Sequence, residues 1–449
     1  MIDCAIIGAG LAGLVAARNL VERGLTVVVV EARDRVGGRV ENAILDDGQF
    51  VELGGQWVGP GFDNLVDHAE RYGLATINIA PMGNLVVRLR GQALQVPSAV
   101  EGPQLTPFEV ADLGQGLLRL RRLADRFRSD AVWAQANHVW LEQDLMRWVT
   151  TNLRTRGAKQ RFIEVYEAAF GDMPKDATLG QGLRQVMSGP DLETMLASSG
   201  GLHQKRITGG VAALAEAIAD ELGDVVRLSS PVVKVVHGPQ SATLELADGE
   251  RIEARQVIST LPPRLAVQLE HEPALAPWRA EVASKVSPGN VIKAFLVYET
   301  PFWRERGLSG QSSADAGAIR VTLDASVSDS PRGLLMGFFE GAEADSLSRR
   351  SRTLRERAFT NAVKEAFGDD VPKPLAYLER DWSAEPYTGG CHGAHFAPGA
   401  WSANGPLLAE PDGVLHWAGA EYSARFNGYM EGAVRSGLEA AAEVARNCA

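Results

Sequence analysis

The chain is short of cysteine, of long apolar runs and of clustered basic residues. Its 449 residues include three cysteines, Cys4, Cys391 and Cys448, and this odd, scattered set suits a reducing cytoplasm rather than a disulfide scaffold. No uncharged apolar run reaches the roughly 18 residues that a membrane-spanning helix needs. The net charge is −11 and no basic cluster occurs, so neither a membrane nor nucleic acid is an expected partner.

Arrangements for metal or hydrolytic chemistry are also missing. The eight histidines have no zinc-like spacing, and no Ser–His–Asp set stands out. The length exceeds one ordinary domain, which predicts two or more interleaved domains around a large core. We therefore expect a cytoplasmic globular protein without a bound metal.

What the sequence does contain begins with its first forty residues. Ile2–Ile7 predicts a buried parallel strand, Leu11–Val21 a helix, and Thr26–Val30 a second buried strand. Glu31 follows that strand directly. A carboxylate at this place can accept both hydroxyls of an adenosine ribose and would repel a 2′-phosphate.

A G-x-G-x-x-G motif joins the first strand to the helix. Gly8 allows the tight turn, Gly10 lets the backbone approach a pyrophosphate, and Gly13 lets the helix pack on the strand. The helix start at Leu11 and Ala12 offers free N–H groups and the positive end of the helix dipole. In this strand–turn–helix–strand setting the motif predicts a dinucleotide site.

Two further glycine pairs follow. Ala32, Arg33 and an R-V-G-G-R run containing Gly38 come after Glu31, with Arg35 or Arg39 as the countercharge for a phosphate. Val51–Trp57 predicts a strand that is interrupted by a glycine pair, which implies close approach of a flat group; the residues after Leu53 are Gly54, Gly55, Gln56 and Trp57.

The middle of the chain reads as a helical insertion. Val86–Arg88 and Ala93–Val96 predict a hairpin, and Thr106 to Glu109 is a capping box that starts a helix reaching about Arg128. Further predicted helices cover Val139–Asn152, Lys159–Phe170 and Leu179–Met187. A helix at Val211–Leu222 and a strand meander to Leu261 follow; their strands are Val225–Leu228, Val232–Val236, Thr243–Leu246, Glu250–Ala254 and Val257–Leu261.

Lys293 stands inside Val291–Tyr298, a run that is apolar on both alternating faces and therefore predicts a strand buried on both sides. A buried ammonium is expensive, so this lysine needs a partner or a function. Asp324, Phe338–Phe339 and Tyr377–Trp382 are expected to continue an antiparallel sheet around it.

The last sixty residues hold the most specific pattern. Trp382 is followed nine positions later by Cys391 and then His392. After the predicted strand Val414–Trp417, an A-G-x-E turn with Gly419 and Glu421 leads to the run G-Y-M-E-G-A-V-R-S-G, which begins at Gly428, Tyr429 and Met430 and opens the final helix.

Taken together, these motifs resemble those of the flavin-dependent amine oxidases, the monoamine oxidase and polyamine oxidase family. The order and spacing agree, although Asn42 stands where the family usually has Ser or Thr after R-x-G-G-R, and the helical insertion matches only loosely. The resemblance implies a mixed α/β fold, with a Rossmann-like FAD-binding domain of the two-dinucleotide-binding-domain type. That domain would comprise residues 1–75, 205–285 and 390–449, interleaved with a substrate domain of antiparallel sheet and helices at 76–204 and 286–389.

The resemblance also implies roles for individual residues. Lys293 would be water-bridged to flavin N5, Trp382 would flank the flavin, Tyr429 would form one wall of an aromatic cage, and Val232 would bond the adenine through its backbone. His392 replaces the second cage tyrosine. Cys391 matches the residue that carries a thioether to the flavin 8α-methyl in monoamine oxidases; relatives with non-covalent flavin leave attachment open. Weaker pocket-wall candidates are Trp57, His203 and Gln204.

We therefore expect an FAD-dependent oxidase that converts a small amine to an imine while O2 becomes H2O2, with a homodimer as one option for its assembly. The alternatives are an L-amino-acid oxidase, which needs an arginine such as Arg184 or Arg206 for the substrate carboxylate, and a desaturase or porphyrinogen oxidase, against which Lys293 and Tyr429 argue. A flavin-binding scaffold without turnover is the alternative from another class.

Overall fold

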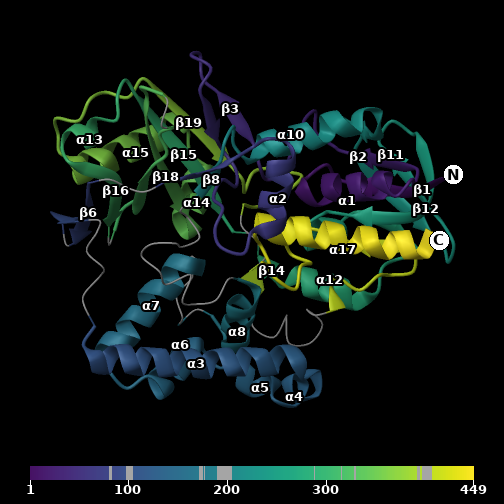
Figure 1. The fold of residues 1–449 in the computed structure, drawn as a ribbon, viewed down its shortest axis with the longest axis horizontal. Helices are drawn as coiled ribbons and strands as arrows, with labels where there is room; N and C mark the ends of the chain where they lie inside the picture. The colour runs from purple at the N-terminus through teal and green to yellow at the C-terminus, as the bar shows by residue number, and fades with distance from the viewer. Residues whose placement is uncertain are drawn as a thin grey trace.

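The structure is a computed structural model that describes residues 1–79, 83–89, 91–97, 105–170, 175, 177–189, 205–287, 289–314, 316–327, 330–391, 395–396 and 407–448. Two large sheets and a layer of helices make up the molecule (Figure 1). Both termini lie at the same side of it, where the first strand begins and the last helix ends.

The first sheet is the predicted nucleotide-binding one. Its strand order is β13-β10-β11-β12-β1-β2-β9, with β21 beside β12, and β1 runs parallel to both neighbours. The prediction of two strands at Glu250–Ala254 and Val257–Leu261 was wrong, because β12 continues unbroken to pair with β1. The strands are β1 (Ile2–Ile7), β2 (Val27–Val30), β9 (Val226–Arg227), β10 (Val232–His237), β11 (Ala242–Leu246), β12 (Arg251–Ser259), β13 (Glu270–Glu272) and β21 (Leu415–Trp417).

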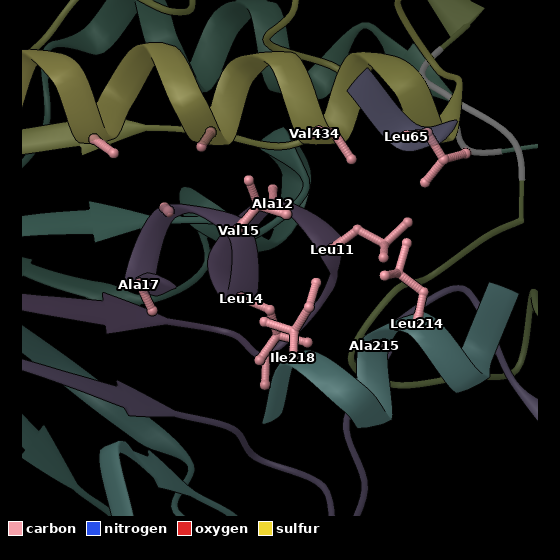
Figure 2. Close-up of a cluster of buried hydrophobic side chains, with 14 of the residues drawn as sticks. Leu11, Ala12, Leu14, Val15, Ala17, Leu65, Leu214, Ala215, Ile218 and Val434 are labelled. Atoms are coloured by element: carbon pink, nitrogen blue, oxygen red, sulfur yellow. The ribbon is translucent and has the colours of Figure 1, made fainter. Parts of the chain in front are cut away.

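Helix α1 (Leu11–Glu22) is packed between α17 (Met430–Cys448) and α10 (Val211–Leu222). Figure 2 shows Ala12 and Val15 directed toward α17, while Leu14 faces Ile218 on the other side. The three helices thereby bury one continuous apolar cluster against the sheet. The predictions for α1 and α10 have the correct starts and ends within one residue, and α17 begins inside the run that was expected to open the final helix.

The approach of α17 to α1 depends on a glycine. A Cβ at Gly437 would lie 2.4 Å from the carbonyl oxygen of Ala12, a distance that no real Cβ adopts. The last helix therefore presses directly onto the backbone of the first. Cys448 belongs to α17 and packs against the same cluster.

The second sheet contains Lys293. Its order is β19-β15-β18-β17-β16-β6-β7, antiparallel except for the β16–β6 pair, and all eight residues of β15 are buried, as predicted. Helices α13 (Phe302–Glu305), α14 (Gly341–Ser348) and α15 (Arg352–Phe367) pack on it. The strands are β6 (Asn84–Leu89), β7 (Gln92–Pro97), β15 (Val291–Tyr298), β16 (Leu308–Ala314), β17 (Val321–Asp324), β18 (Gly333–Glu340) and β19 (Ala376–Asp381).

The helical insertion forms a separate layer with its own core (Figure 1). The capping box at Thr106 is present and starts α3. The segment predicted as one helix at Val139–Asn152 is broken, because the Asp144 carboxylate accepts the Arg147 N–H at 2.7 Å and starts a new helix. The helices are α3 (Pro107–Ser129), α4 (Ala131–Ala136), α5 (His138–Leu141), α6 (Leu145–Asn152), α7 (Arg156–Phe170) and α8 (Leu179–Ser188).

Short elements connect these parts. The prediction of a strand over Val51–Trp57 was wrong beyond Glu52, where β4 ends; Gly55 still donates to the Arg39 carbonyl at 3.1 Å, but no regular ladder continues. Within the described residues, none of the helices has both the length and the apolar character to cross a membrane. The short elements are β3 (Asn42–Ile44), β4 (Phe50–Glu52), β5 (Thr76–Asn78), β8 (Lys205–Ile207), β14 (Val286–Ser287), β20 (His395–Phe396), α2 (Asp63–Arg71), α11 (Pro263–Ala266), α12 (Pro277–Ser284) and the 3₁₀ turn Gly223–Val225.

Candidate functional site

The segment 52–57, which begins at the last residue of β4, binds Lys293 of the second sheet and Trp382, which directly follows strand β19 of that sheet. The carbonyl oxygens of Glu52 and Gly54 accept hydrogen bonds from Lys293 Nζ at 2.7 and 2.8 Å. The carbonyl oxygen between them, on Leu53, accepts the indole N–H of Trp382 at 3.0 Å. Strand β15 and the end of β19 are thus both tied to one short piece of backbone.

Lys293 has the partners that its burial requires. Its side chain is 2 % exposed, and its third acceptor is Gln56 Oε1. The rings of Trp57 and Phe295 lie 5.7 and 5.3 Å from Nζ. Burial lowers the pKa of Lys293 to about 7, so its charge changes in the neutral range.

Glu52 was missed by the sequence analysis. It is 1 % exposed, its Oε2 accepts Arg206 Nε at 2.7 Å, and its Oε1 accepts the Val211 N–H at 3.0 Å. Arg206 also donates to the Ala325 carbonyl. Arg206, once a candidate for a substrate carboxylate, is therefore bound inside the protein. The sequence signal that could have identified Glu52 as a buried acid is its place between the apolar residues Val51 and Leu53.

The G-x-G-x-x-G turn lies against the second glycine pair. The Gly37 N–H donates to the Ala9 carbonyl at 2.8 Å, and a Cβ on Gly38 would lie 3.3 Å from Gly10 Cα. A Cβ on Gly13 would lie 2.0 Å from the Gly8 carbonyl, so the helix packs on the turn as predicted. Because the N-cap of α1 is a glycine, no cap side chain covers the N–H groups of its first turn, including those of Leu11 and Ala12.

Glu31 is also brought to this turn. It is 4 % exposed, and its two carboxylate oxygens accept the Ala9 and Arg33 N–H groups at 2.8 and 3.0 Å. Arg33 Nη1 donates to the same carboxylate at 3.4 Å. A carboxylate has about four lone-pair positions, so about one remains for a hydroxyl donor. The Ser230 N–H donates to the Glu31 carbonyl at 2.8 Å, which brings the start of β10 at Val232 alongside; Ala32 lies in the same bend.

The two candidate countercharges, Arg35 and Arg39, differ. The Arg35 guanidinium donates hydrogen bonds to carbonyl oxygens of its own loop and to the Glu41 carboxylate, so its donors are already occupied. Arg39 forms a double hydrogen bond with the buried Glu421, at 2.6 and 2.9 Å, and lines a cavity of about 300 Å³. Gly419, two residues before Glu421, adopts φ +135° and is held by Ser436 Oγ at 2.8 Å.

The C-terminal motif meets the segment 52–57. A Cβ on Gly55 would lie 2.7 Å from Met430 Sδ, so the side chain of Met430 sits directly on this glycine. Gly428 has φ +85° and donates to the Ala420 carbonyl at 2.9 Å. Burial raises the pKa of Tyr429 to about 12, so its phenol stays neutral.

Of the remaining predicted residues, some lie close to the segment 52–57 or to the C-terminal motif, and others fall outside the described residues. Trp382 is fully buried. Burial raises the pKa of the Cys391 thiol to about 11, while the neighbouring charges of Lys293 and Arg39 act in the opposite sense. Arg184 Nη2 donates to Asn427 Oδ1 at 2.5 Å, one residue before Gly428. His392, His203 and Gln204 fall outside the described residues.

These features fit an FAD molecule. The glycine cradle, the uncapped first turn of α1 and the Glu31 carboxylate match the diphosphate and ribose. The second half of the dinucleotide would reach the segment 52–57, where a lysine, a tryptophan and a second helix N-terminus converge. Such a helix end and ammonium can stabilise negative charge on a reduced flavin.

Comparison with known proteins agrees along nearly the whole chain. The family model described as flavin containing amine oxidoreductase matches residues 11–445. A Mycobacterium tuberculosis protein named as a flavin-containing monoamine oxidase is 33 % identical over 445 residues, covering 99 % of this chain and 96 % of its own length. The amine oxidase B of Sus scrofa is 28 % identical, covering 98 % and 86 %.

Solved structures show the same fold. Putrescine oxidase bound to putrescine superposes with a TM-score of 0.88 at 28 % identity, and 99 % of each chain is covered. Cyclohexylamine oxidase from Brevibacterium oxydans superposes with a TM-score of 0.86 at 29 % identity, again covering 99 % of each chain. The chain therefore belongs to the flavin-containing amine oxidoreductase family and is an FAD-binding oxidoreductase that acts on amines.

Proposed function

We propose that this protein oxidises a small amine to an imine, which hydrolyses to an aldehyde or ketone, with O2 reduced to H2O2. The observation that carries the proposal is the contact of Met430 with Gly55, in the same segment whose backbone binds Lys293. It joins the two ends of the chain around one site. The small primary amines named for the structural relatives, putrescine and cyclohexylamine, support this substrate class.

We assign FAD binding to residues 1–75, 205–285 and 390–449, and the substrate cavity to 76–204 and 286–389. The geometry above supports contacts to the adenosine and diphosphate from the turn, from Glu31 and its neighbours, and from Arg39, and contacts to the flavin from the segment 52–57 and the C-terminal motif. The proposed cofactor residues are Gly8, Gly10, Leu11, Ala12, Gly13, Glu31, Ala32, Arg33, Gly38, Arg39, Gly54, Gly55, Gln56, Trp57, Val232, Trp382, Cys391, Gly419, Glu421, Gly428, Tyr429 and Met430.

FAD supplies the acceptor for the hydride, or its equivalent, from the carbon beside the amine nitrogen. The chain supplies placement and charge. Tyr429 gives a neutral aromatic wall that can align the amine, and Lys293 keeps an ammonium close to the reacting face. Lys293 is buried and Tyr429 is partly buried, which limits bulk water near them and strengthens these interactions. We further propose His392 as the wall opposite Tyr429.

Cys391 is proposed to attach the flavin covalently through a thioether. Burial raises the pKa of its thiol to about 11, and the charges of Lys293 and Arg39 act against that rise, so the proposal rests on the position of Cys391 nine residues after Trp382. We also propose a cytoplasmic location, which suits a chain whose cysteines are all free. A homodimer remains one option for assembly.

An anaerobic screen tests the reaction. Purified protein is mixed with primary, secondary and cyclic amines and with L-amino acids, and the visible flavin absorbance is followed. Bleaching by small primary or cyclic amines, with H2O2 formed once air is admitted, is the expected result. Bleaching by amino acids alone would favour an L-amino-acid oxidase, and no bleaching by any compound would favour a flavin-binding scaffold.

A further inference from the structure

Helix α2 is capped by a residue from the opposite end of the chain. Its own N-cap, Phe62, has no side-chain acceptor for the first-turn N–H groups. Glu431, which is 0 % exposed, supplies one: its Oε2 accepts the Leu65 N–H at 2.9 Å, and its Oε1 accepts Asn64 Nδ2 at 2.7 Å. A buried carboxylate at a helix N-terminus also interacts favourably with the helix dipole. Glu431 thus fixes where α2 begins.

The same carboxylate is linked to an unusual aromatic residue. Arg435, one turn further along α17, forms an ion pair with Glu431 at 2.6 Å and lies over the ring of Phe426 at 5.5 Å. Phe426 is 1 % exposed and adopts φ +54°, a backbone conformation that non-glycine residues seldom take. Residues in such conformations persist only where their surroundings hold them, and they cluster at functional sites.

Phe62, Phe426 and Tyr429 form a set of three mutually contacting rings. The centroid of Phe62 lies 5.4 Å from that of Phe426 and 6.0 Å from that of Tyr429, and Phe426 lies 6.4 Å from Tyr429. The interplanar angles of 69°, 85° and 85° are those of edge-to-face packing. No room is left beside Phe426, since a Cβ on Gly61 would lie 2.7 Å from its Cζ.

We propose that Glu431, Phe426 and Phe62 are positioning residues that fix the ring of Tyr429 in the orientation an amine substrate meets. Glu431 holds the start of α2, which carries Phe62, while Arg435 holds Phe426. The two phenylalanine rings then support Tyr429 from behind. The inference rests on the proposed function in one respect, that Tyr429 faces the amine.

The test compares two variants with a matched control. Phe62→Leu removes one ring contact of Tyr429, and Glu431→Gln removes the charge and one acceptor at α2. Phe359→Leu is the control, because Phe359 is equally buried but belongs to the core of the second sheet. For each FAD-loaded protein, anaerobic stopped-flow with benzylamine gives the dissociation constant and the limiting rate of flavin bleaching. Hydrogen–deuterium exchange then reports the first turn of α2.

For Phe62→Leu we expect the benzylamine dissociation constant to rise about two- to tenfold, the effect of one aromatic pair, with less than a twofold change in limiting rate. Glu431→Gln should show the same rise and faster exchange at residues 63–66. Phe359→Leu should change neither. If both site variants bind benzylamine as the control does, or if exchange in α2 is unaltered in Glu431→Gln, the inference is wrong. Failure of every amine to bleach the unaltered protein would instead refute the proposed function.

Discussion

At the scale of single residues, the placement of Lys293 explains how its amine can be buried and why its pKa is lowered. Three oxygen acceptors from one short segment satisfy its three donors, so an ammonium is tolerated where β15 is otherwise apolar. The sequence alone predicted that this lysine has a partner or a function, because it interrupts an apolar run. It did not identify the acceptors, since Glu52, Gly54 and Gln56 lie about 240 residues away.

The rate at which O2 reoxidises the reduced protein should depend on the charge of Lys293. The pKa near 7 lies below the ordinary 10.5, so the ammonium is present below neutral pH and lost above it. We expect a fall of about tenfold between pH 6 and 8 if only the charged form assists. Lys293→Met should give a slow, flat profile, measured by stopped-flow with air-saturated buffer.

Gln56→Glu is the matched variant for this prediction. A carboxylate in place of the amide would raise the pKa of Lys293 and move the pH midpoint upward. An unchanged midpoint in Gln56→Glu, or a pH dependence retained in Lys293→Met, would show that another group titrates.

Cys391 allows a second prediction at this scale. Acid precipitation of the unaltered protein should leave the yellow colour in the pellet, and Cys391→Ala should release it into the supernatant. Cys448→Ser, which changes a cysteine at the far end of α17, should behave like the unaltered protein. Colour released from all three proteins would refute the thioether.

At the scale of elements, most helices and strands were predicted correctly where local signals suffice. One example is the capping box at Thr106, and another is β15, whose residues other than Lys293 are apolar on both faces of the strand. The errors occurred where distant residues decide. The break before α6 depends on Asp144, which also pairs with Thr178, and β4 ends at Glu52 because its next residues bind Lys293 and Trp382. The role of Glu431 was missed for the same reason.

The contact of α17 with α1 gives a prediction at this scale. Gly437→Ala places a Cβ 2.4 Å from the Ala12 carbonyl and should destabilise the fold by about 1–3 kcal/mol through overpacking. Gly114 lies half-buried in the interior of α3, and a Cβ there would have no neighbour within 4 Å, so Gly114→Ala should instead stabilise the fold by up to about 1 kcal/mol. Urea unfolding gives the free energy of unfolding of both variants. Equal changes in the two variants would contradict the packing argument.

At the scale of the whole molecule, the candidate site is built from segments far apart in sequence. The two ends of the chain were expected to meet because their motifs serve one dinucleotide, and the Met430–Gly55 contact joins them. Strand order is a different matter. That β12 lies between β11 and β1, and that β6 pairs with β16, depends on packing that no local pattern encodes.

Since FAD would contact both ends, its binding should stabilise the molecule as a whole. In a Cys391→Ala background, from which flavin can be removed, adding FAD at 100 times its dissociation constant should raise the free energy of unfolding by about 2.7 kcal/mol. Adding Glu31→Ala should weaken FAD binding and shift the response to higher FAD concentrations, because Glu31 holds the Ala9 turn. Thermal unfolding across an FAD titration measures both; a melting temperature indifferent to FAD would contradict the shared site.

The anchoring of Lys293 and Trp382 through main-chain oxygens has a consequence for how such an enzyme can diversify. A carbonyl is the same whichever amino acid bears it, so replacing Leu53 would alter the local shape without deleting the acceptor that Trp382 uses. Substitutions of the residues that carry these carbonyls leave the hydrogen-bond acceptors of Lys293 and Trp382 in place. Side chains of this segment can therefore vary while the backbone acceptors of Lys293 and Trp382 persist.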